Sequence, residues 1–256
     1  MLPALDILVV EDDPDLAKLT SEALERYGFR VTAANTFKEA HYYLRHRVFD
    51  AVLADLFLDA MDAASSWRDV ATLRTSAPLI PFGLLSGTKI TDATIEQHGL
   101  SFALLKPARL EAIVAAITSC LPAVATLPPD RQATVRSYFA SLEQADWDRL
   151  ESICTDNVVY DLPADSDTFR AAVAGRAAFR QFTEATFARF REPRFAMQDL
   201  RALPRGALVR YEGSWNDPSG CRASLPGAVL FRFEGDRIAE IAIRIEPPVT
   251  DVRGTP

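Results

Sequence analysis

The sequence lacks several features that mark specialised classes of protein. Its 256 residues hold only three cysteines, which are widely spaced and form no CxxC pair. This argues against a disulfide framework or a zinc site and favours a reducing compartment. No apolar run approaches the ~20 residues that cross a bilayer. The N-terminus has no basic leader and turns acidic by residue 11, so we expect no secretory signal and no membrane, and predict a cytoplasmic location.

An excess of positive charge is also missing. Residues 1–121 carry 11 basic against 16 acidic side chains, and residues 122–256 carry 17 against 19. Because phosphate backbones are held by local positive charge, we expect no nucleic-acid partner. His41, His46 and His98 have no cysteine or carboxylate at ligand spacing, so a histidine metal site is not expected either.

What is present in the first half is an alternation of short apolar stretches with segments of helical spacing. Strand-length runs lie at 5–10, 30–34, 51–54, 79–85 and 102–105, and amphipathic helices are predicted at 15–27 and 108–121. Strand and helix alternate five times in about 120 residues. The pattern predicts an α/β doubly wound, five-stranded parallel sheet, whose ligand site lies at the carboxyl ends of its strands.

The pattern of alternating strands and helices ends at residues 122–129, where three prolines fall within eight residues. We predict a domain at 1–121, a Pro-rich linker at 122–129 and a second domain at 130–250. The second half begins with helices and continues with strand-like runs at 156–163, 195–203, 207–215, 223–233 and 238–246. A helix is predicted at 175–190. This order is typical of an α+β domain with an antiparallel meander.

Charged and hydroxyl side chains stand where the strands of the first half end. Three carboxylates gathered there would raise one another's pKa unless a cation balanced them. Carboxylates suit a hard cation such as Mg²⁺, and a nearby lysine and hydroxyl could hold a phosphoryl group. Asp13 is interpreted as an acid of the first helical turn. The side chains are Glu11, Asp12 and Asp13 after the first strand, Asp55 after the third, Ser86 after the fourth and Lys106 after the fifth.

This order resembles the CheY-like, flavodoxin-like receiver domain of two-component response regulators over roughly residues 4–121. The resemblance implies that Asp55 accepts a phosphoryl group from a sensor histidine kinase. It implies that Glu11, Asp12 and Asp55 hold Mg²⁺ with the backbone carbonyl of Phe57. Ser86 and Lys106 would sense the phosphoryl group, and Gly87 would leave the site open.

The sequence departs from this family at two places. Receiver domains usually have an aromatic residue three positions before the lysine, and here that position is Ala103. Phe102 is adjacent, but neighbouring residues of a strand point to opposite faces of the sheet. The loop after the acceptor carries Asp59 and Ala63 where Pro and Gly are usual. The acceptor chemistry is therefore expected, whereas the usual aromatic relay is in question.

The second half resembles the SnoaL-like and ketosteroid-isomerase-like members of the nuclear transport factor two-like superfamily. The resemblance rests on Tyr138-Phe-Ala-Ser-Leu-Glu-Gln-Ala-Asp-Trp-Asp, Asp156-Asn-Val-Val-Tyr-Asp-Leu-Pro163 and Phe231-Arg-Phe-Glu-Gly-Asp-Arg-Ile238. It implies a curved sheet wrapped with helices into a cone around an apolar pocket. We expect Tyr138, Tyr211, Trp215 and Phe231 to line this pocket.

Strand parity predicts which side chains face the interior of this cone. Two of the three catalytic positions of the isomerase-like members fall on Leu162 and Val229, and Asp161 is one residue out of phase. We therefore predict a domain that is not an enzyme. Side chains of the opposite parity are charged, and predict either a solvated face or a dimer contact. The residues expected on the concave face are Val209, Tyr211, Trp215, Val229, Phe231, Phe233, Ile241, Ile243 and Ile245.

The sequence as a whole predicts a response regulator whose output domain forms a homodimer or binds a protein partner or a small apolar ligand. One alternative is a receiver that gates a SnoaL-like enzyme acting on a small apolar substrate. Its motivation is Tyr138, Tyr211 and nearby Asp161, and the direction in which Asp161 points separates the two. A third reading is a degenerate receiver that serves as a protein-interaction surface and binds no Mg²⁺.

Overall fold

A computed structural model describes residues 5–55, 63–121, 127–163, 170–203, 206–216 and 220–245. The chain divides into two compact units, residues 1–123 and 124–256. Each unit has its own sheet and its own apolar core. Within the described residues, no helix is long and apolar enough to cross a membrane.

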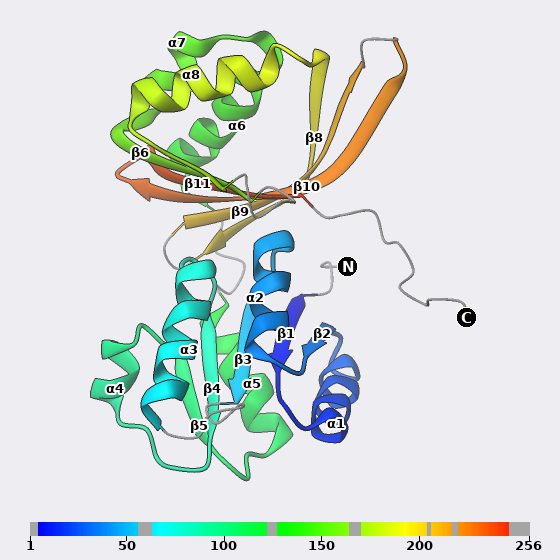
Figure 1. Ribbon diagram of the computed structural model, residues 1–256, viewed down its shortest axis with the longest axis vertical. Helices are drawn as coiled ribbons and strands as arrows, with labels where there is room; N and C mark the ends of the chain where they lie inside the picture. Colours follow the sequence, from blue (N-terminus) through cyan, green and yellow to red (C-terminus); the bar gives the residue numbers. More distant parts are fainter. Residues whose placement is uncertain are drawn as a thin grey trace. The chain divides into compact units, whose positions relative to one another are not determined.

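The first unit is a five-stranded parallel sheet in the order β2-β1-β3-β4-β5 (Figure 1). All four strand pairings are parallel, which confirms the predicted doubly wound sheet. The fourth strand begins three residues later than the sequence predicts, at Phe82. The elements are β1 (Asp6–Val10), α1 (Pro14–Glu25), β2 (Arg30–Ala34), α2 (Phe37–His46), β3 (Ala51–Asp55), α3 (Ala63–Ser76), β4 (Phe82–Ser86), α4 (Asp92–Gln97), β5 (Phe102–Leu105) and α5 (Leu110–Cys120).

Helices cover both faces of this sheet. On one face, Ile7 and Val9 of β1 pack with Leu24 of α1 and with Ile113 and Ile117 of α5. Helices α2 and α3 lie side by side on the other face (Figure 1). Strand β1 is buried at every position, and its residues after Asp6 are apolar on both faces of the sheet. Because all the strands run parallel, their carboxyl ends lie at the same edge of the sheet.

The second unit is a six-stranded sheet in the order β7-β6-β11-β10-β9-β8. Strands β8 to β11 form the predicted antiparallel meander, but β11 and β6 pair in parallel, so the sheet is mixed. No tight hairpin joins β6 to β11, so the turn rules of the meander do not set its direction. The elements are α6 (Pro129–Gln144), α7 (Trp147–Ser152), β6 (Cys154–Pro163), β7 (Arg170–Ala174), α8 (Arg176–Phe187), β8 (Arg191–Leu203), β9 (Gly206–Asn216), β10 (Arg222–Glu234) and β11 (Arg237–Ile245).

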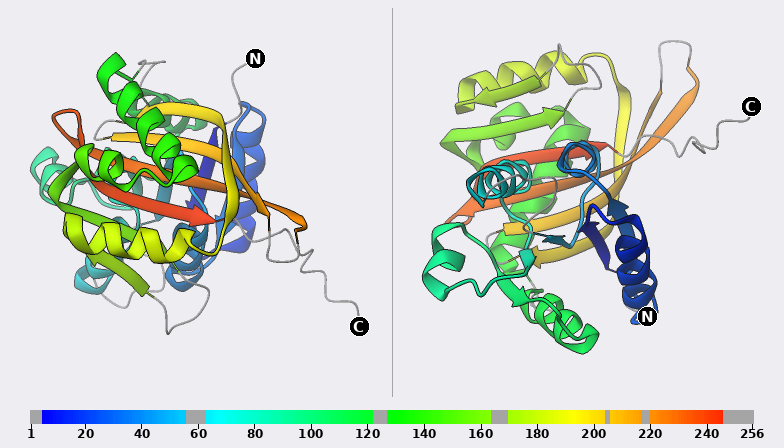
Figure 2. Two further views of the ribbon diagram at one scale, coloured as in Figure 1. Left: turned by 90° about the horizontal axis from the view of Figure 1, so that it is seen from above. Right: turned by 60° about the horizontal axis from the view of Figure 1, so that its bottom comes forward.

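The sheet of the second unit is curved, and α6, α7 and α8 lie over one face (Figures 1 and 2). The core lies between these helices and the sheet. It contains six of the residues predicted for the concave face, and Ile243 packs against it. Trp215 contacts Phe190 instead, and Ile245 at the end of β11 is 38% exposed.

The second unit differs from the prediction at several element boundaries and contains one strand that was not predicted. Helix α6 begins at Pro129, and Leu127 is buried in the core of the second unit, so the end of the predicted linker belongs to the second unit. Residues 122–126 of that linker lie outside the described residues. Strand β7 was not predicted, because Arg170–Ala174 is too short to show a period. Helix α8 ends at Phe187, three residues earlier than its aromatic spacing suggests.

Candidate functional site

Three carboxylates converge at the carboxyl edge of the first sheet. Glu11 and Asp12 follow β1, and Asp55 is the last residue of the neighbouring strand β3. One carboxylate oxygen from each lies within 4.8 Å of the others. Glu11 is 5% exposed, whereas Asp12 is open to solvent. The structure thus brings the three predicted acids together, and an oxygen set of this kind fits a hard divalent cation.

Lys106 reaches this cluster from the end of β5. Its Nζ donates to Oδ2 of Asp55 at 2.8 Å and to Oε2 of Glu11 at 3.3 Å. The backbone N–H of Lys106 donates to the carbonyl of Ser86 at 2.8 Å, which fixes where the side chain starts. The predicted lysine therefore bonds directly to the predicted acceptor.

The cluster changes the proton affinity of its members. Burial raises the pKa of Glu11, the charge of Lys106 opposes this shift, and the charge of Asp55 adds to it. Burial alone would lower the pKa of Lys106, but its hydrogen bonds and charge interactions with Asp55 and Glu11 outweigh burial and raise it. Lys106 therefore stays protonated and positively charged beside the carboxylates of Glu11 and Asp55.

Ser86 lies buried at the end of β4, 1% exposed. Its Oγ accepts a hydrogen bond from the backbone N–H of Thr88 at 3.1 Å and lies 3.4 Å from the Thr88 hydroxyl. A Cβ atom placed on Gly87 would meet nothing within 4 Å. The space beside the serine is thus open, as the sequence predicts.

Two neighbouring residues hold the acidic turn in place. The side-chain amide of Asn35 donates to the carbonyl of Glu11 at 3.0 Å, and the N–H of Glu11 donates to the carbonyl of Ala34. Sequence reasoning missed Asn35, although its place directly after β2 was a usable signal. Asp13 caps α1 by accepting from the N–H groups of Asp15 and Leu16, so it precedes the first turn rather than lying in it.

Two predictions around the site have other outcomes. Phe57, whose carbonyl was expected to bind the cation, lies outside the described residues. Phe102 points away from the position that an aromatic at Ala103 would occupy. Its ring packs over Gly83 of β4, where a Cβ would lie 2.1 Å from Cζ of the ring.

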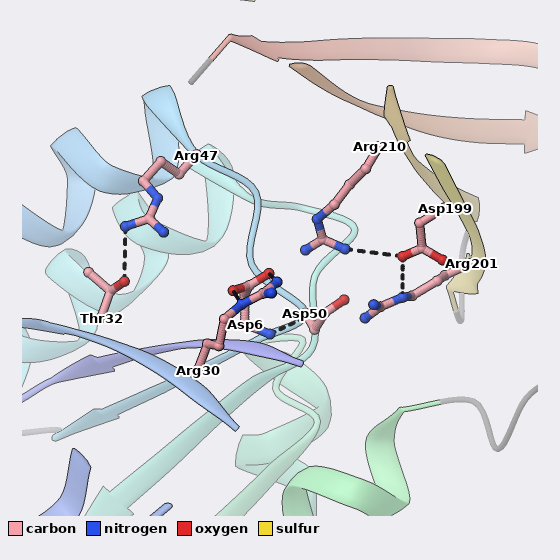
Figure 3. Close-up of polar contacts among 8 residues, drawn as sticks. All are labelled: Asp6, Arg30, Thr32, Arg47, Asp50, Asp199, Arg201 and Arg210. Carbon is pink, nitrogen blue, oxygen red and sulfur yellow. Dashed lines mark hydrogen bonds and ion pairs between the residues drawn. The ribbon is translucent and has the colours of Figure 1, made fainter. Parts of the chain in front are cut away.

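Charged side chains elsewhere in each unit form pairs of their own (Figure 3). At the amino edge of the first sheet, Arg30 makes two 2.7 Å hydrogen bonds to Asp6, whose N–H donates to the carboxylate of Asp50. In the second unit, Asp199 lies 2.6 Å from Arg201 and 3.4 Å from Arg210. The first group lies at the opposite edge of the first sheet from the acidic cluster, and the second group lies on the sheet of the second unit.

Most of the residues predicted to line a pocket in the second unit belong to its hydrophobic core. Tyr138 and Phe231 are almost fully buried, with ring centroids 5.0 Å apart, and Tyr211 packs 5.4 Å from Phe139. Trp215 is not part of this cluster. Sequence reasoning missed Tyr160, which is buried beside Phe179. Its alternation with Val158 and Leu162 along β6 was the available signal.

The tyrosines of this core are neutral. Burial raises the pKa of Tyr138 far above its usual value, with smaller contributions from Tyr160 and Tyr211. Burial raises the pKa of Tyr211 to about 12. The family resemblance assigns two acid positions of isomerase chemistry to Leu162 and Val229; Val229 belongs to the core and Leu162 packs against it.

Asp161 points away from this core. It alternates with Tyr160 and Leu162, and its Oδ2 lies 3.1 Å from Nη1 of Arg244 on β11. The Arg244 side chain is 4% exposed and that of Asp161 is 30% exposed, so the pair is partly shielded from solvent. The predicted charged face is built from such pairs, since Arg232 likewise bonds Glu240 at 3.1 Å.

Two family models match the chain. The response regulator receiver domain matches residues 7–118, and the SnoaL-like domain matches residues 135–241. The transcriptional regulatory protein ZraR of Escherichia coli O157:H7 is 26% identical over 135 residues, which are 53% of this chain and 30% of ZraR. The chain therefore matches less than a third of the length of this curated relative.

Solved structures resemble the two units separately. The crystal structure of a CheY-like response regulator receiver domain protein from Methanospirillum hungatei JF-1 is 20% identical, covers 45% of this chain and 92% of its own, and has a TM-score of 0.41. The crystal structure of an NTF2-like protein from Anabaena variabilis ATCC 29413 is 13% identical, covers 48% of this chain and 95% of its own, and has a TM-score of 0.43.

Proposed function

Because this chain joins a response regulator receiver domain to a SnoaL-like domain, we propose that it is a two-component response regulator phosphorylated on Asp55 by a sensor histidine kinase. The observation that carries the proposal is the contact of Lys106 with Asp55 beside two further carboxylates. An isolated surface aspartate has no such surroundings. The arrangement supplies an acceptor, a set of metal ligands and a fixed positive charge within one edge of a sheet.

A Mg²⁺ ion fits the donor set, since Glu11, Asp12 and Asp55 offer hard oxygen ligands close together. When bound, the ion would neutralise charge on the phosphoryl oxygens during transfer. Glu11 and Asp12 would hold it, and Asp55 would share it. Lys106 provides a second positive charge from the protein itself. We propose a role in this set for the Phe57 carbonyl as well.

The transfer itself needs positioning more than covalent help from other side chains. A carboxylate oxygen of Asp55 attacks the phosphorus of a phosphohistidine, the phosphorus–nitrogen bond breaks and a phosphorus–oxygen bond forms. The imidazole nitrogen keeps the bonding electrons and takes up a proton. Lys106 then pairs with a phosphoryl oxygen, and the hydroxyl of Ser86 donates to another.

We propose that the second domain is a binding module that contacts a protein partner, a small apolar ligand or a second copy of the chain. Its hydrophobic cluster holds apolar side chains, neutral phenols and the Cys154 thiol, and the uncharged Ser141, Thr155 and Thr183 are buried in the same unit. General acid–base catalysis needs an ionisable group that reaches the substrate. Asp161 is directed to Arg244 on the opposite face, which favours binding over a receiver-gated enzyme. Sedimentation of the full chain with and without phosphorylation tests the homodimer.

The acceptor is tested with a small radiolabelled phosphodonor, such as acetyl phosphate, and Mg²⁺. The wild-type chain should take up label that is sensitive to hydroxylamine, as an acyl phosphate is, and Asp55→Asn should take up none. Asp13→Asn is the matched control, because it changes a neighbouring carboxylate that only caps α1. Undiminished label on Asp55→Asn contradicts the assignment of Asp55 as the acceptor. Failure of the wild type to bind Mg²⁺ contradicts the proposal and favours a degenerate receiver.

A further inference from the structure

We propose that the stacked pair of Trp67 on α3 and His98 at the end of α4 reports phosphorylation, in place of the aromatic residue that position 103 lacks. The two rings lie 4.1 Å apart between centroids and 18° from parallel. This inference rests on the proposed phosphorylation of Asp55. It adds a route by which the phosphoryl group changes the surface of the first unit.

The neighbouring aromatic residue cannot serve as the reporter. Phe102 packs against the core that contains Ile113 and Ile117 on one face of the sheet. Its ring occupies the space above Gly83, so closely that no Cβ would fit there. To reach the other face of the sheet, the ring would have to leave this core. Ala103 itself has no side chain that could move.

The route begins at Ser86, whose Oγ accepts from the N–H of Thr88. A serine hydroxyl that turns to donate to a phosphoryl oxygen loses its good alignment with this N–H. Thr88 is exposed, and three residues later Thr91 caps α4 by accepting from the N–H of Thr94. A change at Ser86 therefore acts on the short loop that leads directly into α4.

Helix α4 is weakly anchored. It has six residues, Asp92–Gln97, and none of them is buried. Elements with few buried apolar contacts open and shift at low cost in free energy. Its C-terminal end is held against α3 by the stack of His98 on Trp67. Next to it, a Cβ on Gly99 would lie 3.4 Å from Nη2 of Arg74 on α3.

A shift of α4 therefore acts mainly on the stack of His98 on Trp67, which joins α4 to α3. Arg74 bonds the carbonyls of Ala77, Pro78 and Ile80 and so stays fixed to the end of α3. His98 is the C-cap of α4 and moves with the helix. The stack separates when α4 moves, and the face of the Trp67 indole is released to solvent. The surface at α3 and α4 then differs between the two states.

The experiment uses the full chain with Trp147→Phe and Trp215→Phe, which leaves Trp67 as its only tryptophan. Beryllofluoride with Mg²⁺ imitates the phosphoryl group, and ¹⁹F NMR measures its binding. On binding, the emission of Trp67 should shift to the red and its quenching by acrylamide should increase. In the same background, His98→Ala should already show this emission without beryllofluoride and change no further.

Ser86→Ala in that background should bind beryllofluoride more weakly, because it lacks the hydroxyl that donates to the phosphoryl group. At concentrations at which ¹⁹F NMR shows the site filled, the emission of Trp67 should stay unchanged. Hydrogen exchange of residues 92–98 gives a second readout, which should increase in the wild type only on binding. If beryllofluoride binds and neither readout changes, the proposed role of the Trp67–His98 stack is wrong, while the proposed acceptor site stands. If no beryllofluoride binds to the wild type, both the acceptor site and the reporter are wrong.

Discussion

Nζ of Lys106 lies 2.8 Å from Oδ2 of Asp55, so the lysine is bonded to the carboxylate that the proposed cation would share. The lysine therefore competes with Mg²⁺ for the carboxylates. Unit charges ~4 Å apart interact by about 4 kcal/mol near a protein surface. The Lys106 side chain is 29% exposed, and solvent and salt reduce this value.

From this contact we predict that Lys106→Ala binds Mg²⁺ more tightly. A net gain of about 1 kcal/mol corresponds to roughly fivefold in affinity. Titration calorimetry of the full chain at fixed ionic strength measures the effect. Arg136→Ala is the control, because it removes the same charge from an exposed position of α6 in the other unit. Unchanged or weaker Mg²⁺ binding by Lys106→Ala would contradict the competition.

A second prediction concerns the packing of Phe102 on Gly83. A methyl group at residue 83 would lie within 2.5 Å of three ring atoms, and the ring cannot move without leaving the core. Overpacking of this kind costs ~1–3 kcal/mol, so Gly83→Ala should lower the free energy of unfolding by that amount. Urea denaturation followed by the fluorescence of Trp67 measures it.

The double variant separates this clash from other effects of alanine in a strand. Phe102→Ala alone removes core packing and destabilises the first unit. With the ring gone, the methyl group at residue 83 has room, so Gly83→Ala should cost much less in a Phe102→Ala background. Additive losses in the double variant would mean that the ring and the methyl group do not collide.

The acidic site could be predicted because it depends on order along the chain. In a parallel sheet, residues that follow the strands meet at one edge whatever the details of packing. Glu11, Asp55 and Lys106 needed only that rule. Asn35 was missed because it contributes one hydrogen bond to a backbone carbonyl, and its place directly after β2 was its only signal in the sequence.

The second unit was predicted less completely for physical reasons. Alternation assigned Val229 and Phe231 to the interior correctly, but alternation says nothing of how far the core extends along a strand. Ile245 has the right parity and still lies exposed at the end of β11. The parallel pairing of β6 with β11 joins segments some 80 residues apart, and no local signal specifies such a pair.

A third prediction follows from the cap of α1. The carboxylate of Asp13 accepts from the N–H groups of Asp15 and Leu16 at 2.9 and 3.1 Å. Asp13→Ala leaves both donors to solvent and should lower the free energy of unfolding of the first unit by about 1 kcal/mol. Asp13→Ser should recover most of the loss, because a serine hydroxyl caps as well. Equal stability of Asp13→Ala and the wild type in urea would count against the cap.

A fourth prediction concerns the stability of the second unit in alkali. Burial raises the pKa of Cys154 from 9.0 to about 12 and that of Tyr211 from 10.0 to about 12. Both groups are neutral when protonated, so the unfolded chain loses these protons at lower pH than the folded one. Their contribution to stability is complete below about pH 9 and is lost as the pH rises towards 12.

The expected loss is up to about 1.4 kcal/mol per pH unit for each group within its window. Urea denaturation at pH 8, 9.5 and 11 measures it in a Trp67→Phe chain, where the remaining tryptophans, Trp147 and Trp215, both lie in the second unit. Cys154→Ala is less stable at pH 8 because a buried side chain is removed, but its stability should fall less between pH 8 and 9.5, where the thiol titrates ahead of the tyrosines. A free energy of unfolding that stays constant from pH 8 to 11 would show that these groups are exposed to solvent in the folded domain.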